Sequence, residues 1–162
     1  MTPLKYTLAW LLTFLPLAAL AWTSHYNGDE FHFLTQAKQV AAGAVITRDF
    51  FEFIMPGTFL LTGGLFALFG PSLLGGRLLQ AAAVAVLALI YWRLGRAIGL
   101  KGWLAALPVA MLLGVYYLRN PWFSHHWFGQ VGVGLGLLAA WWALGRKAHW
   151  PWAVVGLAVG AT

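Results

Sequence analysis

Long apolar runs that carry almost no charge restrict the fold of this chain more than any other feature. The chain is 61% hydrophobic and only 9% charged, and a domain of 162 residues cannot bury that much apolar surface in a core of its own. Runs of this length are typical of helices that cross a lipid bilayer. We therefore predict an all-α, polytopic integral membrane protein with a single membrane domain over residues 1–162. The runs cover residues 6–22, 56–70, 73–92, 103–118, 127–144 and 151–162.

The ten Lys and Arg residues lie singly or in pairs near the ends of these runs. Nucleic-acid binding needs a basic face in polar surroundings, so we exclude nucleic acid as a partner and expect membrane lipids around the chain. The distribution fits the positive-inside rule, which predicts a cytoplasmic N-terminus and a multi-pass topology. The chain has no Cys, which excludes disulfides and thiolate chemistry.

Residues 6–22 are predicted to form the first span. A signal peptide cleaved after Ala21 is the alternative, because small residues lie at Ala19 and Ala21. We favour the uncleaved span, since the run is longer than the ~7–15 apolar residues of a signal peptide and further spans follow.

The run at residues 56–70 is predicted not to cross the membrane. If it crossed, Arg93, Arg96 and Lys101 would all lie on the outer face, against the orientation rule. It is also shorter than the ~20 residues of a span and holds several glycines between Pro56 and Pro71. We therefore predict that residues 24–72 form one outer-face module, interfacial and partly re-entrant.

Residues 73–162 then hold the remaining spans, about five in all. The last run, residues 151–162, would rise only about 18 Å as a helix, short of a ~30 Å hydrocarbon core. We therefore expect the chain to be the N-terminal part of a longer protein.

All four acidic residues, Asp29, Glu30, Asp49 and Glu52, fall inside the predicted outer module. Carboxylates are costly in lipid, so this module is where chemistry is expected. The segment from Asn27 to Glu30 is similar to a capping box, which predicts a helix that runs to about residue 42. One face of that helix is apolar, which is typical of a helix lying flat on a membrane surface.

Asp29 and Glu30 are the candidate catalytic residues. An ionised carboxylate at the bilayer surface can take a proton from a hydroxyl group or ligate a divalent cation, so the metal requirement stays open. The alternative is that both residues only cap the helix and keep the loop hydrated. Arg48 suits the binding of a lipid-linked phosphate, and a local salt bridge with Asp49 is the commoner alternative.

A second predicted outer loop, residues 119–126, offers Arg119, Ser124, His125 and His126. One of the histidines can join Asp29 or Glu30 around a phosphate or a metal. Adjacent histidines diverge on a helix, however, so a site that uses both is geometrically poor. Anchoring at the lipid–water boundary is the favoured alternative.

The order of these features closely resembles the N-terminal part of the GT-C superfamily of membrane glycosyltransferases, over roughly residues 5–130. The similar groups are the protein O-mannosyltransferases, the lipid A aminoarabinose transferases and related bacterial polyprenyl-phosphate-sugar transferases. The segments that carry the resemblance are Gly28-Asp29-Glu30, a helix ending at Gly43, Arg48-Asp49-Phe50, Pro56-Gly57, residues 65–70 and Arg77-Leu78.

The resemblance implies a glycosyltransferase in the bacterial inner membrane. It would move a sugar from a polyprenyl-phosphate carrier to a lipid, glycan or protein acceptor on the outer, periplasmic face. It implies that Asp29 is the base that activates the acceptor and that Glu30 orients it or helps to hold a metal. Arg48 and Arg119 would hold the donor phosphate.

The chain departs from the family pattern in its second outer loop, which has no acidic residue. His125 or His126 would substitute there, or the chain belongs to a subgroup that works differently. The family's C-terminal part is absent, so we expect this piece to be inactive by itself. The alternative function is non-enzymatic, as a transporter portion or an assembly subunit, and the absence of a charge in the middle of any predicted span disfavours a transporter.

Overall fold

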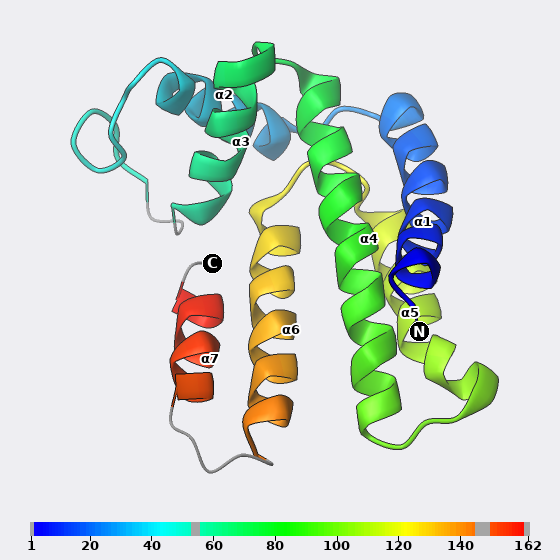
Figure 1. Ribbon diagram of the computed structural model, residues 1–162. Coiled ribbons are helices and arrows are strands. Elements are labelled where there is room, and N and C mark those ends of the chain that lie inside the picture. The colour runs from blue at the N-terminus through cyan, green and yellow to red at the C-terminus, as the bar shows by residue number, and fades with distance from the viewer. Residues whose placement is uncertain (1, 53–55, 145–149, 161–162) are drawn as a thin grey trace.

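The computed structural model describes residues 2–52, 56–144 and 150–160, and the regular elements in them are helices, as predicted (Figure 1). The longer elements are α1 (Pro3–Thr23), α2 (Gly28–Ala41), α3 (Gly57–Phe69), α4 (Leu73–Ala97), α6 (His125–Leu144) and α7 (Trp150–Gly160). Between α4 and α6 lie the short helices η1 (Gly102–Ala106), α5 (Leu107–Ala110), η2 (Met111–Tyr116) and η3 (Tyr117–Arg119).

Four helical segments are long and apolar enough to cross a membrane: Pro3–Thr23, Leu73–Ala97, Gly102–Arg119 and His125–Leu144. Successive segments run in opposite directions along the bundle (Figure 1). The fifth predicted span corresponds to α7, of which 11 residues are described. The class of fold therefore agrees with the prediction, while insertion and the number of crossings stay predictions.

The run at residues 56–70 forms α3, a helix of 13 residues that is about 20 Å long and shorter than a bilayer core. It lies beside α2 at one end of the bundle, which we call the capped end and which comprises residues 22–52, 56–72 and 119–126 (Figure 1). Gly63 allows the close approach, because a Cβ atom there would lie 2.8 Å from Cγ1 of Val40.

The apolar face of α2 was predicted to lie on the membrane surface, but in the structure it packs against protein. Phe33 and Ala37 of this face are buried, and they pack in a cluster with Phe59 and Phe66 of α3. The amphipathic pattern was correct, but protein covers the apolar face. A second core holds α1, α4, η2 and α6 together; it contains Leu17, Ala81, Val84, Leu87, Ala88, Leu112, Tyr117 and Trp127.

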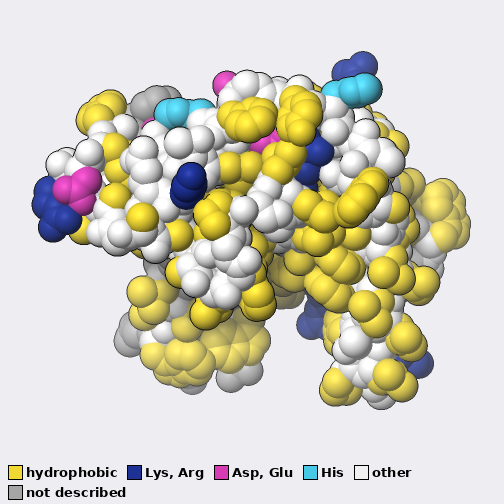
Figure 2. All heavy atoms as spheres, turned by 90° about the horizontal axis from the view of Figure 1, so that it is seen from above, with side chains coloured by type: hydrophobic (Ala, Val, Ile, Leu, Met, Phe, Trp, Pro, Cys, Tyr) yellow, Lys and Arg dark blue, Asp and Glu magenta, His cyan; other side chains and the backbone are white. Residues whose placement is uncertain are grey.

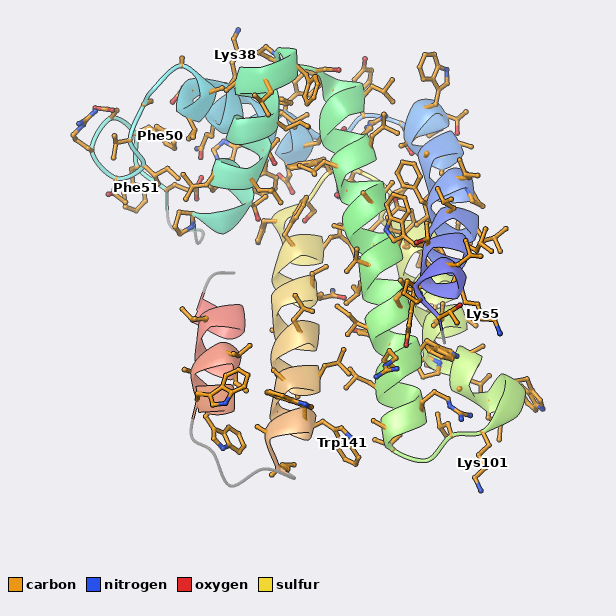
Figure 3. All side chains as sticks on the ribbon, viewed as in Figure 1. Lys5, Lys38, Phe50, Phe51, Lys101 and Trp141 are labelled. Carbon is orange, nitrogen blue, oxygen red and sulfur yellow. The ribbon has the colours of Figure 1, made fainter. Side chains whose placement is uncertain are left out.

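Basic residues gather at the opposite end of the bundle. The Arg93 guanidinium at the end of α4 donates a hydrogen bond of 2.6 Å to the Tyr6 hydroxyl near the start of α1. Lys101 lies at this end and its side chain points outward from the bundle, whereas Lys38 of α2 points outward at the capped end (Figure 3). Arg146 and Lys147, which also entered the orientation argument, lie outside the described residues.

Candidate functional site

The first turn of α2 places the two predicted catalytic carboxylates in opposite environments. Asn27 is the N-cap, and its side-chain oxygen accepts a hydrogen bond of 2.9 Å from the Asp29 N–H. Asp29 is exposed, whereas Glu30 is completely buried. Glu30 does not complete the predicted capping box, because its carboxylate turns inward to Arg77 of α4.

The Glu30–Arg77 pair is bidentate, with Arg77 Nε and Nη2 each 2.7 Å from a carboxylate oxygen. The other guanidinium N–H groups donate to the backbone carbonyls of Ala21, Ser24 and His25, at 3.2, 2.9 and 3.0 Å. A buried charge pair is tolerated when its remaining hydrogen-bonding groups are satisfied in this way. The pair thus ties the end of α1 and the start of α2 to α4.

The same carboxylate also fixes the second loop. The Phe123 N–H donates to Glu30 Oε1 at 2.9 Å, and the amide of Gln80 on α4 accepts from the Ser124 N–H at 2.7 Å and donates to the Pro121 carbonyl at 3.2 Å. Glu30 therefore accepts three short hydrogen bonds. This arrangement assigns it to the scaffold of the site and leaves Asp29 as the accessible acid.

Asp29, His125 and His126 line one pocket of about 260 Å³ at the capped end. Adjacent histidines were expected to diverge; instead the two ring centroids are only 3.9 Å apart, and both residues line this pocket at the start of α6. The structure thus brings together three of the predicted site residues. The other lining residues are Phe33, Asn120, Trp122, Ser124 and Trp127.

The predicted phosphate-binding arginines are not in this pocket. Arg48 lies in the loop beyond α2, and its Nε and Nη2 atoms donate to the Asp49 carboxylate at 2.9 and 2.7 Å. This local salt bridge, helped by the Val45 N–H, lowers the pKa of Asp49 to about 2. Arg119 is exposed at the end of η3 and does not line the pocket either.

Two further groups lie next to residues of the pocket, and neither was among the predicted site residues. Glu52 is buried, and its Oε2 atom is 3.1 Å from Nε2 of His32, whose side chain is 55% exposed. Glu52 and Asp29 both lie close enough to His125 to interact with its charge. The spacing of Asp29, His32 and Gln36 along one face of α2 is the signal that could have indicated His32.

In the part of the chain that the structure describes, no three His, Asp or Glu side chains come together as a site for a divalent cation. The predicted use of Glu30 as a metal ligand does not fit its three hydrogen bonds to protein donors.

Below the pocket, a chain of apolar hollows continues along the bundle. The first, about 330 Å³, shares His125 and His126 with the site and includes Tyr91 and Gln130. The second, about 530 Å³, again includes Tyr91 and Gln130 and reaches Met111. A long apolar chain can therefore lie against α4 and α6 while its polar head reaches Asp29.

Seen from the capped end, acidic side chains lie among large hydrophobic ones (Figure 2). Trp22, Tyr26 and Phe31 are among the exposed aromatic residues there, which is the arrangement expected at a lipid–water boundary. No protein-family model, curated protein or solved structure matches this chain.

Proposed function

We propose that this chain is the sugar-transferring part of a GT-C-type membrane glycosyltransferase, which moves a sugar from a polyprenyl phosphate to an acceptor hydroxyl. The observation that carries the proposal is the pocket in which exposed Asp29 meets His125 and His126, next to apolar hollows that continue along the bundle. A lipid-linked donor needs this combination of a polar reaction centre and an apolar groove.

Asp29 is the proposed base. As the acceptor oxygen bonds to the anomeric carbon of the sugar, its proton passes to the Asp29 carboxylate. The bond between the anomeric carbon and the phosphate oxygen breaks, and polyprenyl phosphate leaves with the bonding electrons. A base held within hydrogen-bond reach of the attacking hydroxyl typically contributes ~10²–10⁴-fold to the rate.

The donor phosphate is proposed to lie at the start of α6 rather than on Arg48. His125 and His126 line the pocket there, and the positive end of the dipole of a 20-residue helix attracts anions. Arg48 is already paired with Asp49. Arg119 is next in sequence to the pocket residue Asn120, and its positive charge is proposed to attract the donor phosphate from a longer distance.

The scaffold supports the same proposal. Glu30 and Arg77 fix the second loop, so the distance between α2 and α6 is set by buried hydrogen bonds rather than by a mobile loop. Arg77 lies in the second turn of α4 and is neutralised by Glu30, so it is not the isolated mid-span charge that would favour a transporter.

The first prediction tests Asp29 in the full-length protein. Asp29→Asn removes the charge but keeps the size and hydrogen-bonding capacity of the side chain, so expression and membrane insertion should be unchanged. Transfer from a polyprenyl-phosphate sugar should fall by ~10²-fold or more, as expected when a general base is lost.

Asp49→Asn is the matched control, because Asp49 is also an exposed acid of the same module but is paired with Arg48 away from the pocket. It should leave transfer near normal. Full turnover in Asp29→Asn would refute the assignment of the base.

A further inference from the structure

We infer that Glu52 and His32 form a proton relay beside the reaction centre, in which buried Glu52 orients the exposed imidazole that receives the proton from Asp29. The inference rests on the proposed function. Glu52 and His32 both belong to the outer-face module, and Glu52 is an acidic residue of the kind that the second outer loop lacks.

The burial of the pair is the first support. Glu52 lies outside any helix, yet its side chain is only 2% exposed, whereas that of His32 is 55% exposed. A buried carboxylate that holds an exposed imidazole is the orienter–base arrangement found in hydrolytic triads. Glu52 accordingly fixes one ring nitrogen and leaves the other accessible.

Hydrogen-bond chemistry identifies the fixed nitrogen. His32 Nε2 lies 3.1 Å from Glu52 Oε2 and also 3.1 Å from the amide of Gln36. A carboxylate only accepts, so Nε2 must carry the proton. A half-turn of the Gln36 amide brings its oxygen, which is buried without a partner, onto the same N–H. Nδ1 is then the free base.

The location of the pair supports transfer from Asp29. Asp29, His32 and Phe33 lie within one turn on the same side of α2. The Phe33 ring lines the pocket and contacts both imidazoles edge-on, with centroids 5.6 Å from His32 and 5.0 Å from His125. His32 therefore lies next to the pocket residue Phe33 and is paired with Glu52; Asp29 precedes it by three residues on α2, and His125 lies across the Phe33 ring.

The relay balances the reaction. After sugar transfer, Asp29 holds the proton of the acceptor hydroxyl and must lose it before the next turnover. In the proposed relay the proton moves to His32 Nδ1, which restores the Asp29 carboxylate. Glu52 compensates the imidazolium charge, and the proton then passes to water. The net products are the glycosylated acceptor, polyprenyl phosphate and one proton.

The second prediction concerns the pair itself and needs no substrate. In the full-length protein, labelled with ¹⁵N-histidine in nanodiscs, His32 should show a slowly exchanging imidazole N–H signal, because that proton is held by Glu52. Glu52→Ala, which removes the acceptor, should make this N–H exchange faster and weaken the signal, and Asp29→Asn should keep it. Absence of the signal in the unaltered protein overturns the inference.

Turnover of the same protein tests the relay. His32→Ala should lower kcat about 10²-fold, within the usual range for a proton-transferring group, without changing the KM for the donor. Added imidazole should restore much of the rate, since the site of His32 is exposed, but should not restore Asp29→Asn. Lys38→Ala, at an exposed site on the same helix, is the control. Its kcat should equal that of the unaltered protein, and added imidazole should not change it.

The outcomes separate the two hypotheses. Normal kcat in His32→Ala, or a loss that imidazole does not rescue, overturns the relay while the proposed function stands. If the unaltered protein transfers no sugar although the N–H signal is present, the proposed function and the relay fall together, and only the Glu52–His32 pair remains.

Discussion

Among single residues, Glu30 shows how a sequence motif can conceal two different roles. Asp29 and Glu30 are adjacent, but a helix turns about 100° per residue, so one side chain faces the pocket and the other the bundle. Glu30 is bonded to Arg77, Phe123 and, through Arg77, to the end of α1. Its charge therefore supports the geometry of the site rather than its chemistry.

The third prediction follows from this burial. Glu30→Gln leaves Arg77 as an uncompensated buried charge, and breaking a buried pair in this way costs about 3–5 kcal/mol. We expect a clear loss of thermal stability in detergent, measured by unfolding with a fluorescent or scattering readout. Asp49→Asn, which removes an exposed pair, should change stability little. Equal stability of the two variants would contradict the structural role of Glu30.

The sequence predicted those site features that depend on neighbours along the chain. The Asn27 cap and the Arg48–Asp49 pair are local, so residue type and spacing were sufficient to indicate both. The Glu30–Arg77 bond joins residues 47 positions apart, and the His32–Glu52 bond joins residues 20 apart. Which partner such a charge finds depends on the packing of the helices, and no periodicity encodes it.

Among the secondary-structure elements, α2 and α3 form a unit that depends on small residues at their contact. A Cβ atom at Gly63 would lie 2.8 Å from Val40 Cγ1 and 3.2 Å from the Ala37 carbonyl oxygen, whereas one at Gly64 would meet nothing within 4 Å. Substituting Gly63 therefore tests the packing of α2 against α3, whereas substituting Gly64 tests helix propensity alone.

The fourth prediction uses this matched pair. Gly64→Ala should be neutral or stabilising by up to about 1 kcal/mol, because alanine is the better helix former. Gly63→Ala should destabilise by about 1–3 kcal/mol, because the α2 backbone must move to admit the methyl group. Thermal unfolding of both variants measures the difference. If Gly63→Ala is as stable as Gly64→Ala, α2 and α3 do not pack as described.

Hydrophobic periodicity and length predicted most of the helices, since both depend on local sequence. They did not predict what covers the apolar face of α2, because a pattern identifies a buried face but not the partner that buries it. They also did not predict the irregular helix between Gly102 and Arg119, in which 3₁₀, α and π turns follow one another around Pro108. Proline removes one backbone donor, and the turns on either side of it adjust to the loss.

For the whole molecule, the direction in which each predicted span crosses the membrane decides whether all residues of the site face the same compartment. In Figure 1 the capped end gathers α2, α3 and the loop before α6, while Lys101 marks the other end in Figure 3. The pocket therefore needs α3 to turn back within the module, because a crossing α3 would place Lys38 and residues 98–101 on the same side.

The last prediction tests that arrangement. Residues 1–162 contain no cysteine, so each introduced cysteine is the only thiol in this part of the protein. Lys38→Cys, Ile98→Cys and Arg119→Cys alter exposed side chains, two at the capped end and one at the opposite end. In intact bacterial cells, a membrane-impermeant maleimide should label Lys38→Cys and Arg119→Cys and leave Ile98→Cys unlabelled until the membrane is opened. The positive-inside rule sets this direction, because Arg93, Arg96 and Lys101 surround position 98. Labelling of Lys38→Cys and Ile98→Cys from the same side would show that α3 crosses the bilayer, and the pocket between α2 and α6 could not then form.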